Sequence, residues 1–256
     1  MLQHVYERAS MARYLTSTII ATDDQRVFDA ARAFGAPVRM TRRDHLSGTD
    51  RVAEVASAEN AAIIVNIQAD EPLIDPAAID AAILPVAHDA GIVMSTLKKR
   101  IEDPREIADP NVVKVVANHA GDAIYFSRSP IPYCRERVTS NNTLGDPQSS
   151  PRNDPQGRPK AERSERLGTG QAMGPPHGGS AACFKHIGLY VYQRDFLLNY
   201  SLLPVGPLER AERLEQLRAL ENGYAIRVVE TEYESFGVDT PEDLERVSRL
   251  FEATVI

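Results

Sequence analysis

Cysteine is scarce in this 256-residue chain, with Cys134 and Cys183 as its two occurrences. Two cysteines so far apart exclude a secreted disulfide framework and favour a reducing compartment. No apolar run approaches the roughly 18 residues of a membrane span, and residues 1–13 carry charges without the apolar core of a signal peptide. We therefore expect a cytoplasmic protein with no membrane segment.

Basic residues are also too few for a nucleic-acid coat. Lysine and arginine total 29 against 36 acids, a net charge of −7, which argues against nucleic acid or an anionic membrane as partner. The chain has no Walker phosphate loop, no Gly-x-Gly-x-x-Gly and no zinc-ligand spacing. Neither cysteine has a context that would activate it as a nucleophile.

What is present is an alternation of short apolar strands with amphipathic helices. Strands separated by helical patterns suggest βαβ units and a mostly parallel sheet. The sequence therefore predicts an α/β fold, with a mostly parallel mixed sheet flanked by helices. We expect strands at residues 18–22, 38–40, 63–67, 92–97, 112–116, 123–127, 187–192 and 225–229, and helices at 2–12, 25–34, 49–58, 194–200, 208–221 and 241–251.

One stretch interrupts this alternation. Residues 141–182 contain seven glycines and six prolines but few large apolar side chains. Such a composition cannot bury enough surface to offset its ordering entropy. We expect a single domain over residues 1–256 with a disordered insertion at 141–182. Its charges nearly cancel, which favours an inert loop over a binding arm.

The sharpest local motif is Gln68-Ala69-Asp70-Glu71-Pro72, directly after the predicted strand at 63–67. In open α/β sheets, ligands lie beyond the carboxyl ends of the strands. A carboxylate there can hold Mg²⁺, which prefers oxygen ligands and bridges to substrate phosphates. Asp70 and Glu71 could instead simply cap the following turn.

Two further segments could carry function or only structure. Asp239, before Thr240 and Pro241, occupies a helix N-cap position but could also reach a metal shared with Asp70. The loop of residues 41–51 contains Arg42 and Ser47 and leads into a helix, a setting that binds anions. Loop arginines are more often only solvated.

The strand near residues 186–192 alternates with a period of two, which places His186, Gly188, Tyr190 and Tyr192 on one face. Tyrosines on a strand are more often packing residues than ligand contacts. Glu215 and Gln216 lie in an amphipathic helical pattern, where they could be ordinary surface positions.

Taken in order, these segments resemble the 3-deoxy-manno-octulosonate (Kdo) cytidylyltransferase family, also called CMP-Kdo synthetases. The resemblance covers nearly the whole chain outside residues 141–182. Its motifs are Ala21-Thr22-Asp23, Met40-Thr41-Arg42, Ser47-Gly48-Thr49, Gln68-x-Asp70-Glu71-Pro72, Asn111-x-Val113-Lys114, Tyr125-Phe126-Ser127-Arg128, His186-Ile187-Gly188-Leu189-Tyr190, Glu215-Gln216-Leu217-Arg218 and Gly237-Val238-Asp239-Thr240-Pro241.

The resemblance implies a nucleotidyltransferase (Rossmann-like) fold and a cytoplasmic homodimer that joins CTP and Kdo into CMP-Kdo and diphosphate for lipopolysaccharide biosynthesis. It also implies catalysis by positioning and by charge neutralisation through Mg²⁺. Asp70 favours the Kdo branch, because the similar CMP-sialic acid synthetases usually have Thr-Ser-Pro near that position.

Residue roles follow from the same resemblance. Asp70 and Asp239 would be the catalytic carboxylates that hold the metal, and Arg42 and Ser47 would contact the cytidine. Arg128 would bind the sugar carboxylate as a planar bidentate donor. The residues implied for the sugar hydroxyls are Gln68, His186, Tyr190, Glu215 and Gln216.

The sequence departs from the family at its start. The family opens with a central strand and a basic loop of the type A-R-x-x-S-T-R-L-P-x-K that grips the triphosphate, whereas Met1 falls just after that loop. We expect the natural start to lie upstream. Two alternatives stay open: a non-catalytic remnant that binds nucleotide or sugar acid, and a cytidylyltransferase for a related acid such as 8-amino-Kdo or sialic acid.

Overall fold

The computed structural model describes residues 1–45, 47–133, 182–238 and 240–254. Residues 1–131 and 183–256 belong to one compact unit, and residues 132–182 to a second. The predicted insertion at 141–182 lies outside the described residues except for Ala182, and Asp239 lies outside them too. The predicted disorder of the insertion, and the single domain over 1–256, therefore stay predictions.

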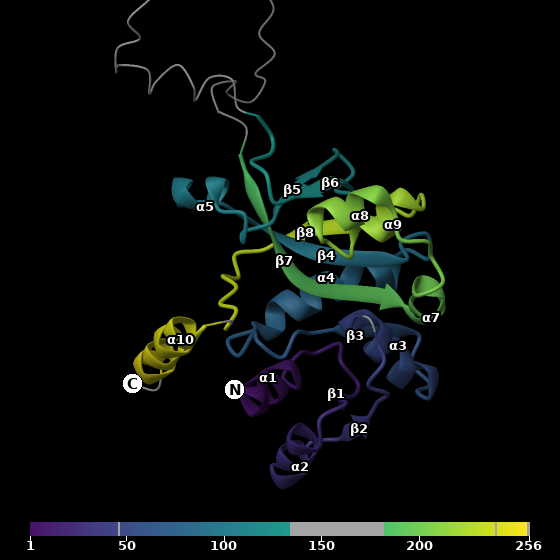
Figure 1. The fold of residues 1–256 in the computed structure, drawn as a ribbon, viewed down its shortest axis with the longest axis vertical. Coiled ribbons are helices and arrows are strands. Elements are labelled where there is room, and N and C mark those ends of the chain that lie inside the picture. Colours follow the sequence, from purple (N-terminus) through teal and green to yellow (C-terminus); the bar gives the residue numbers. More distant parts are fainter. Residues whose placement is uncertain (46, 134–181, 239, 255–256) are drawn as a thin grey trace, which may run out of the picture. The chain divides into compact units, whose positions relative to one another are not determined.

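A mixed sheet forms the centre of the first unit (Figure 1). Its strand order is β6-β5-β7-β4-β8, and β3 also pairs with β7. A smaller parallel sheet joins β1 to β2. The bounds are β1 Ile20–Thr22, β2 Val38–Met40, β3 Ile63–Asn66, β4 Met94–Arg100, β5 Lys114–Ala117, β6 Ala123–Ser127, β7 Phe184–Gln193 and β8 Arg227–Glu230.

The α/β class with a mixed sheet is confirmed, but the expectation of mostly parallel pairing is wrong for the described strands. β1·β2 and β4·β8 are parallel, whereas β3·β7, β4·β7, β5·β6 and β5·β7 are antiparallel. The reason is β7, a ten-residue strand that runs antiparallel to three neighbours. Its alternating buried and half-buried residues are typical of antiparallel strands.

Helices cover the sheet and connect its strands. The bounds in the described part of the chain are α1 Leu2–Ala9, α2 Gln25–Ala33, α3 Gly48–Ser57, α4 Pro76–His88, α5 Pro104–Ala108, α7 Arg194–Tyr200, α8 Pro207–Glu212, α9 Leu217–Glu221 and α10 Pro241–Thr254. None of these helices is both long enough and apolar enough to cross a membrane.

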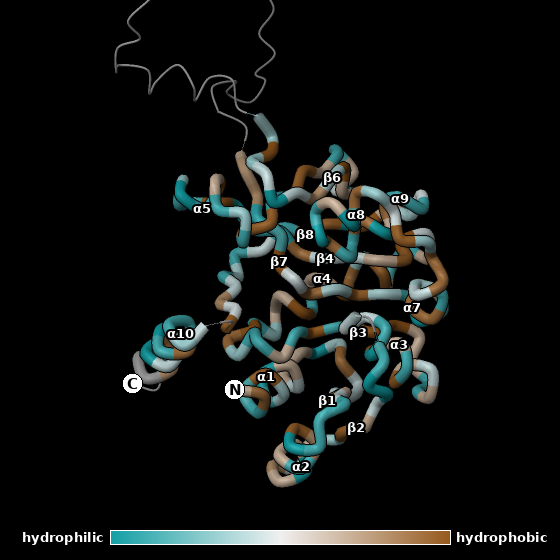
Figure 2. Tube along the Cα trace, viewed as in Figure 1, coloured by the Kyte–Doolittle hydropathy of each residue, from teal (hydrophilic) through white to brown (hydrophobic). Residues whose placement is uncertain are grey.

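Helix α4 was not anticipated from the sequence. The Asp75 side chain caps it by accepting from the Ala77 N–H at 2.9 Å, and Pro76 stands at its first turn, where no N–H is needed. Figure 2 shows α4 as largely hydrophobic and α10 as largely hydrophilic. Ile79 and Ile83 of α4 pack in a core cluster with one face of β7, so α4 covers that face of the sheet.

A second core cluster lies on the other face of the sheet, where β7 contributes Tyr192 and β4 contributes Met94. Helices α3, α7 and α9 contribute to the same cluster. The expected single helix over 208–221 is wrong, because the chain breaks between α8 and α9 at Arg213, whose φ of 53° is left-handed. Glu215 and Gln216 therefore lie in the turn between the two helices, and Gln216 is the N-cap of α9.

Candidate active site

The candidate site is built around an unpaired stretch of β7. Strand β4 pairs along one edge of β7, while β5 pairs with its start and β3 with its end on the opposite edge (Figure 1). The N–H of His186 still donates to Val113 at 2.8 Å, and Tyr190 pairs with Asn66. No strand of the described chain pairs with residues 187–189 on this edge. We call this stretch the sheet gap.

A glycine leaves open space on the site face of the sheet gap. Ile187 and Leu189 pack into the α4 cluster, so the residues that alternate with them face the other way. A Cβ added at Gly188 would meet no heavy atom within 4 Å. The His186 and Tyr190 rings flank this position, with their centroids 5.4 Å apart.

His186 is held as a neutral imidazole. Its Nε2 lies 2.9 Å from the Thr96 Oγ1, which also lies 2.7 Å from the Leu189 carbonyl oxygen. Because the single hydroxyl proton of Thr96 goes to that carbonyl, the imidazole donates from Nε2, and Nδ1 is left as an acceptor. Burial lowers the pKa of His186 to about 3. The ring therefore stays uncharged at neutral pH and can accept a hydrogen bond from a hydroxyl.

Glu215 is positioned by the start of α3 and the end of α7. The Ser47 hydroxyl donates to the Glu215 carboxylate at 3.1 Å. The Ser47 Oγ also accepts from the Asp50 N–H, which caps α3. The Tyr200 hydroxyl donates to the Glu215 carbonyl at 2.7 Å. Burial raises the pKa of Glu215, while hydrogen bonds from Thr49 and Ser47 oppose that rise. The Glu215 carboxylate therefore accepts hydrogen bonds from Ser47 and Thr49.

Tyr190 and Gln216 complete this side of the site. Burial raises the pKa of Tyr190 well above its ordinary value, and the nearby Glu215 charge adds to the rise. The phenol therefore stays protonated and can donate a hydrogen bond. Gln216 is buried and follows Glu215 as the N-cap residue of α9. His186, Tyr190, Glu215 and Ser47 thus belong to one neighbourhood.

The Gln68–Pro72 loop meets a distant segment of the chain. The Val238 N–H donates to the Asp70 carbonyl at 3.0 Å. Glu71 accepts from the Tyr233 hydroxyl at 2.8 Å and also from the Ser235 hydroxyl. The Gln68 side chain is exposed and Asp70 is half-buried. Residues 233–238 are thereby tied to the loop that holds Asp70.

The residues at this loop fit a magnesium ion. No group of three or more His, Cys, Asp or Glu side chains gathers as a metal shell among the described residues. Mg²⁺ does not require such a shell, because it commonly binds one or two carboxylates together with waters and substrate phosphates. The Asp70 carboxylate would supply one hard oxygen ligand from the loop that follows β3. The Glu71 carboxylate is engaged by two hydroxyls.

Arg128 lies at the end of β6 and is anchored to α8. Its backbone N–H donates to the Glu212 carboxylate at 3.0 Å, and its Nε donates to the Glu212 carbonyl at 2.9 Å. Nη1 donates to the Pro110 carbonyl at 2.9 Å. Two of its three guanidinium nitrogens are therefore engaged by backbone oxygens. The guanidinium carries further N–H donors on Nη1 and Nη2, which leaves a bidentate grip on a carboxylate chemically open. That role stays a prediction.

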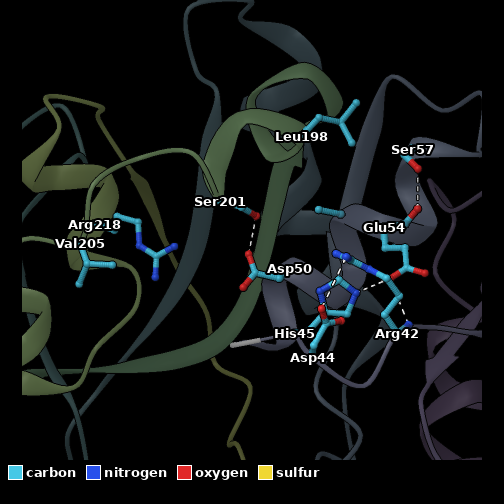
Figure 3. A pocket seen from close by; sticks show the side chains of 11 residues that line it. Arg42, Asp44, His45, Asp50, Glu54, Ser57, Leu198, Ser201, Val205 and Arg218 are labelled. Carbon is cyan, nitrogen blue, oxygen red and sulfur yellow. Dashed lines mark hydrogen bonds and ion pairs between the residues drawn. The ribbon is translucent and has the colours of Figure 1, made fainter.

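Arg42 lies at a cavity of about 480 Å³ between α3 and α7 (Figure 3). His45 bonds Glu54 in this cavity wall, and the Glu54 carboxylate also accepts from the Arg42 N–H at 3.2 Å. The hydrogen bond from His45 is the main cause that lowers the pKa of Glu54. Ser47 contacts Glu215 instead. The two residues predicted to contact the nucleotide thus bind different partners.

The structure brings together some of the predicted site residues and leaves others apart. Ser47, His186, Tyr190, Glu215 and Gln216 form one group, and Asp70 lies in the loop that follows β3. Arg128 and Arg42 contact other groups. Sequence reasoning missed Thr96, which orients His186, and Asn66, the polar residue within an apolar strand. An asparagine within the otherwise apolar segment 63–67 was the sequence signal that could have identified Asn66.

Comparison with known proteins defines the class first. A family model described as Cytidylyltransferase matches residues 1–231. A 3-deoxy-manno-octulosonate cytidylyltransferase of Solibacter usitatus is 68% identical over 256 residues, all of this chain and 86% of that protein. The enzyme of that name from Geobacter metallireducens is 51% identical over 247 residues, 96% of this chain and 85% of that protein.

A solved structure agrees with these relatives. The structure of CMP:2-keto-3-deoxy-manno-octonic acid synthetase complexed with CTP has a TM-score of 0.79 and 38% identity, and the match covers 99% of this chain and 88% of that one. The chain belongs to the 3-deoxy-manno-octulosonate cytidylyltransferase family.

Proposed function

We propose that this protein transfers the cytidylyl group of CTP to Kdo and releases diphosphate. The observation that carries the proposal is the 68% identity, over the whole chain, to a relative named for this reaction. The solved relative complexed with CTP supports the nucleotide. The grouping of Ser47, His186, Tyr190 and Glu215 beside the sheet gap supports a polyhydroxylated second substrate.

The reaction is a displacement at phosphorus. The anomeric hydroxyl oxygen of the sugar acid forms a bond to the α-phosphorus of CTP, the bond from that phosphorus to the bridging oxygen breaks, and diphosphate leaves. The hydroxyl proton goes to solvent. Asp70 and Asp239 would hold a Mg²⁺ ion, which would supply charge neutralisation to the triphosphate. The protein contributes positioning, which together with electrostatic stabilisation accounts for nearly all of phosphoryl-transfer catalysis.

The site residues suit a sugar acid because they offer donors and acceptors together. His186 accepts at Nδ1, Glu215 accepts at its carboxylate, and Tyr190 donates from its hydroxyl. Gln68 and Gln216 add amides that both donate and accept. Arg128 is assigned to the sugar carboxylate, and Arg42 and Ser47 to the cytidine. A substrate with several hydroxyls needs this mixture, since each buried hydroxyl must find a partner.

The test is Mg²⁺-dependent release of diphosphate from CTP and Kdo, with CTP alone and ATP plus Kdo as controls. We expect release that requires both CTP and Kdo and that stops when EDTA removes the metal. Folded protein that binds CTP and Kdo without releasing diphosphate would contradict the proposal.

The alternatives from the sequence are less favoured. A remnant that binds without turnover would not need to keep both Asp70 and the grouped sugar-side residues. Enzymes for sialic acid or for an 8-amino analogue are tested in the same assay, because one changed hydroxyl can alter rates by orders of magnitude. Faster release with either acceptor than with Kdo would reassign the substrate.

Two parts of the proposal concern the protein as a whole. We place it in the cytoplasm, on the strength of its two widely spaced cysteines. We also propose a homodimer, as the family resemblance implies. Light scattering on the purified protein measures the mass, and a mass of one chain at micromolar concentration would contradict the dimer.

A further inference from the structure

Asn66 is the last residue of β3 and borders the sheet gap. In the register of β3 with β7, Asn66 lies opposite Tyr190, and Ile64 lies opposite Tyr192. Side chains directly opposite one another in an antiparallel pair share a face. Ile64, Tyr190 and Tyr192 pack in the cluster away from α4. The Asn66 side chain therefore lies on the same face as Tyr190.

The side-chain amide nitrogen of Asn66 is buried, and no described residue accepts a hydrogen bond from it. The residue is 4% exposed, and its Nδ2 has no hydrogen-bond acceptor in the described part of the chain. A buried amide nitrogen without an acceptor destabilises the folded state, so native proteins rarely keep one without a reason. An apolar residue of similar size would fill the same place without that cost.

The position of this donor points to the ligand site. Asn66 directly precedes the loop with Gln68 and Asp70, at the end of the sheet where α/β proteins bind ligands. Asn66 of β3 is paired with Tyr190 of β7, and Tyr190 is paired with Thr96 of β4. Thr96 is the residue that orients His186. The open space at Gly188 lies on the same face. A donor here complements the acceptor at His186 Nδ1.

We propose that the Asn66 amide donates a hydrogen bond to an oxygen of the sugar acid. This rests on the proposed function, because it adds a residue to the same site. A sugar acid presents hydroxyl and carboxylate oxygens that accept such a bond. Binding then gives the Nδ2 donor an acceptor, which it lacks in the described part of the chain. The amide therefore selects for a substrate oxygen at that point.

The test compares Asn66→Leu with Ile64→Val, which alters the same face of the same strand two residues earlier. In the Leu variant we expect the KM for Kdo to rise about tenfold, while the KM for CTP stays within about twofold, as for loss of one neutral hydrogen bond. Ile64→Val should leave both KM values unchanged. The ligand-free Asn66→Leu variant should melt no lower than wild type, because the Asn66 Nδ2 has no acceptor to lose in the described part of the chain.

A binding measurement separates this proposal from the reaction itself. Kdo alone, without CTP, should raise the melting temperature of wild type and of Ile64→Val, and raise that of Asn66→Leu less. This readout decides the proposal even if diphosphate release fails and the proposed function falls. No shift in wild type, or an equal shift and KM in the Leu variant, would overturn it and assign the amide to a bound water.

A folding failure is also decisive. If Asn66→Leu does not fold, Asn66→Ala repeats both measurements with a smaller side chain that cannot clash. If neither variant folds while Ile64→Val does, the amide is a structural group and the proposal is wrong.

Discussion

The N–H of Val238 donates a hydrogen bond to the carbonyl oxygen of Asp70 at 3.0 Å, which joins two segments that are far apart in the sequence. Glu71 reinforces this junction by accepting from Tyr233 and Ser235. The two neighbouring acidic residues in the loop after β3 therefore have different roles. Glu71 holds the C-terminal segment in place, and the Asp70 carboxylate is the one that we assign to the metal.

Asp70→Asn tests that assignment. Replacing the carboxylate with an amide removes a charged ligand but keeps the shape, so we expect diphosphate release to fall at least about a hundredfold while the fold survives. Circular dichroism and the melting temperature check the fold. Asp239→Asn should behave in the same way. Wild-type rates in either variant at saturating Mg²⁺ would refute the metal role.

Gly188→Val tests whether the open space of the sheet gap holds substrate. The added side chain meets nothing within 4 Å at its Cβ, and valine favours strands, so we expect the fold to keep its melting temperature. The KM for Kdo should rise at least about tenfold because the side chain occupies the substrate's place.

The neighbouring Ile187→Val is the matched control for this variant. Ile187 faces the α4 cluster, so its truncation should cost about 0.5–1.5 kcal/mol of stability without changing KM. Gly188→Val with an unchanged KM would show that the substrate lies elsewhere.

His186 predicts a pH dependence of stability. Its pKa is lowered from 6.5 to about 3 by burial, so between these values the unfolded chain binds a proton that the folded chain does not. Stability contributed by neutral His186 is therefore present above pH 6.5 and is lost as the pH falls towards 3, by up to about 1.4 kcal/mol per pH unit. Urea unfolding of wild type and His186→Gln between pH 7 and 4 measures the difference. Parallel slopes for the two proteins would contradict it.

Lys114 predicts a large stability effect in the core. Its ammonium group is fully buried and donates to the carbonyls of Asp109, Val112 and Arg128 at 2.5–2.7 Å. Burial lowers the pKa of Lys114. Lys114→Met removes the cation but leaves three carbonyls without their donor, so we expect a loss of about 2–4 kcal/mol. Urea unfolding measures this loss, and a Met variant as stable as wild type would show that the three hydrogen bonds contribute nothing net.

Local elements were predictable from the sequence because their signals are local. Val38–Met40, Ala123–Ser127 and Arg194–Tyr200 have the bounds expected from periodicity. The break at Arg213 was not predictable, because the apolar spacing of residues 208–221 fits one continuous helix. Tertiary contacts at Tyr200 and Ser47 hold Glu215 outside that helix.

The sequence by itself determined the α/β class, most of the strands and helices, and the family through its ordered motifs. Only the tertiary structure decided that β7 runs antiparallel to three strands and that Ser47 meets Glu215. It also decided that Asn66 shares a face with Tyr190 and that its Nδ2 has no acceptor among the described residues. The physical reason is the range of the interactions. Periodicity and capping act within a few residues, whereas strand partners are selected by long-range pairing and core packing across the whole chain.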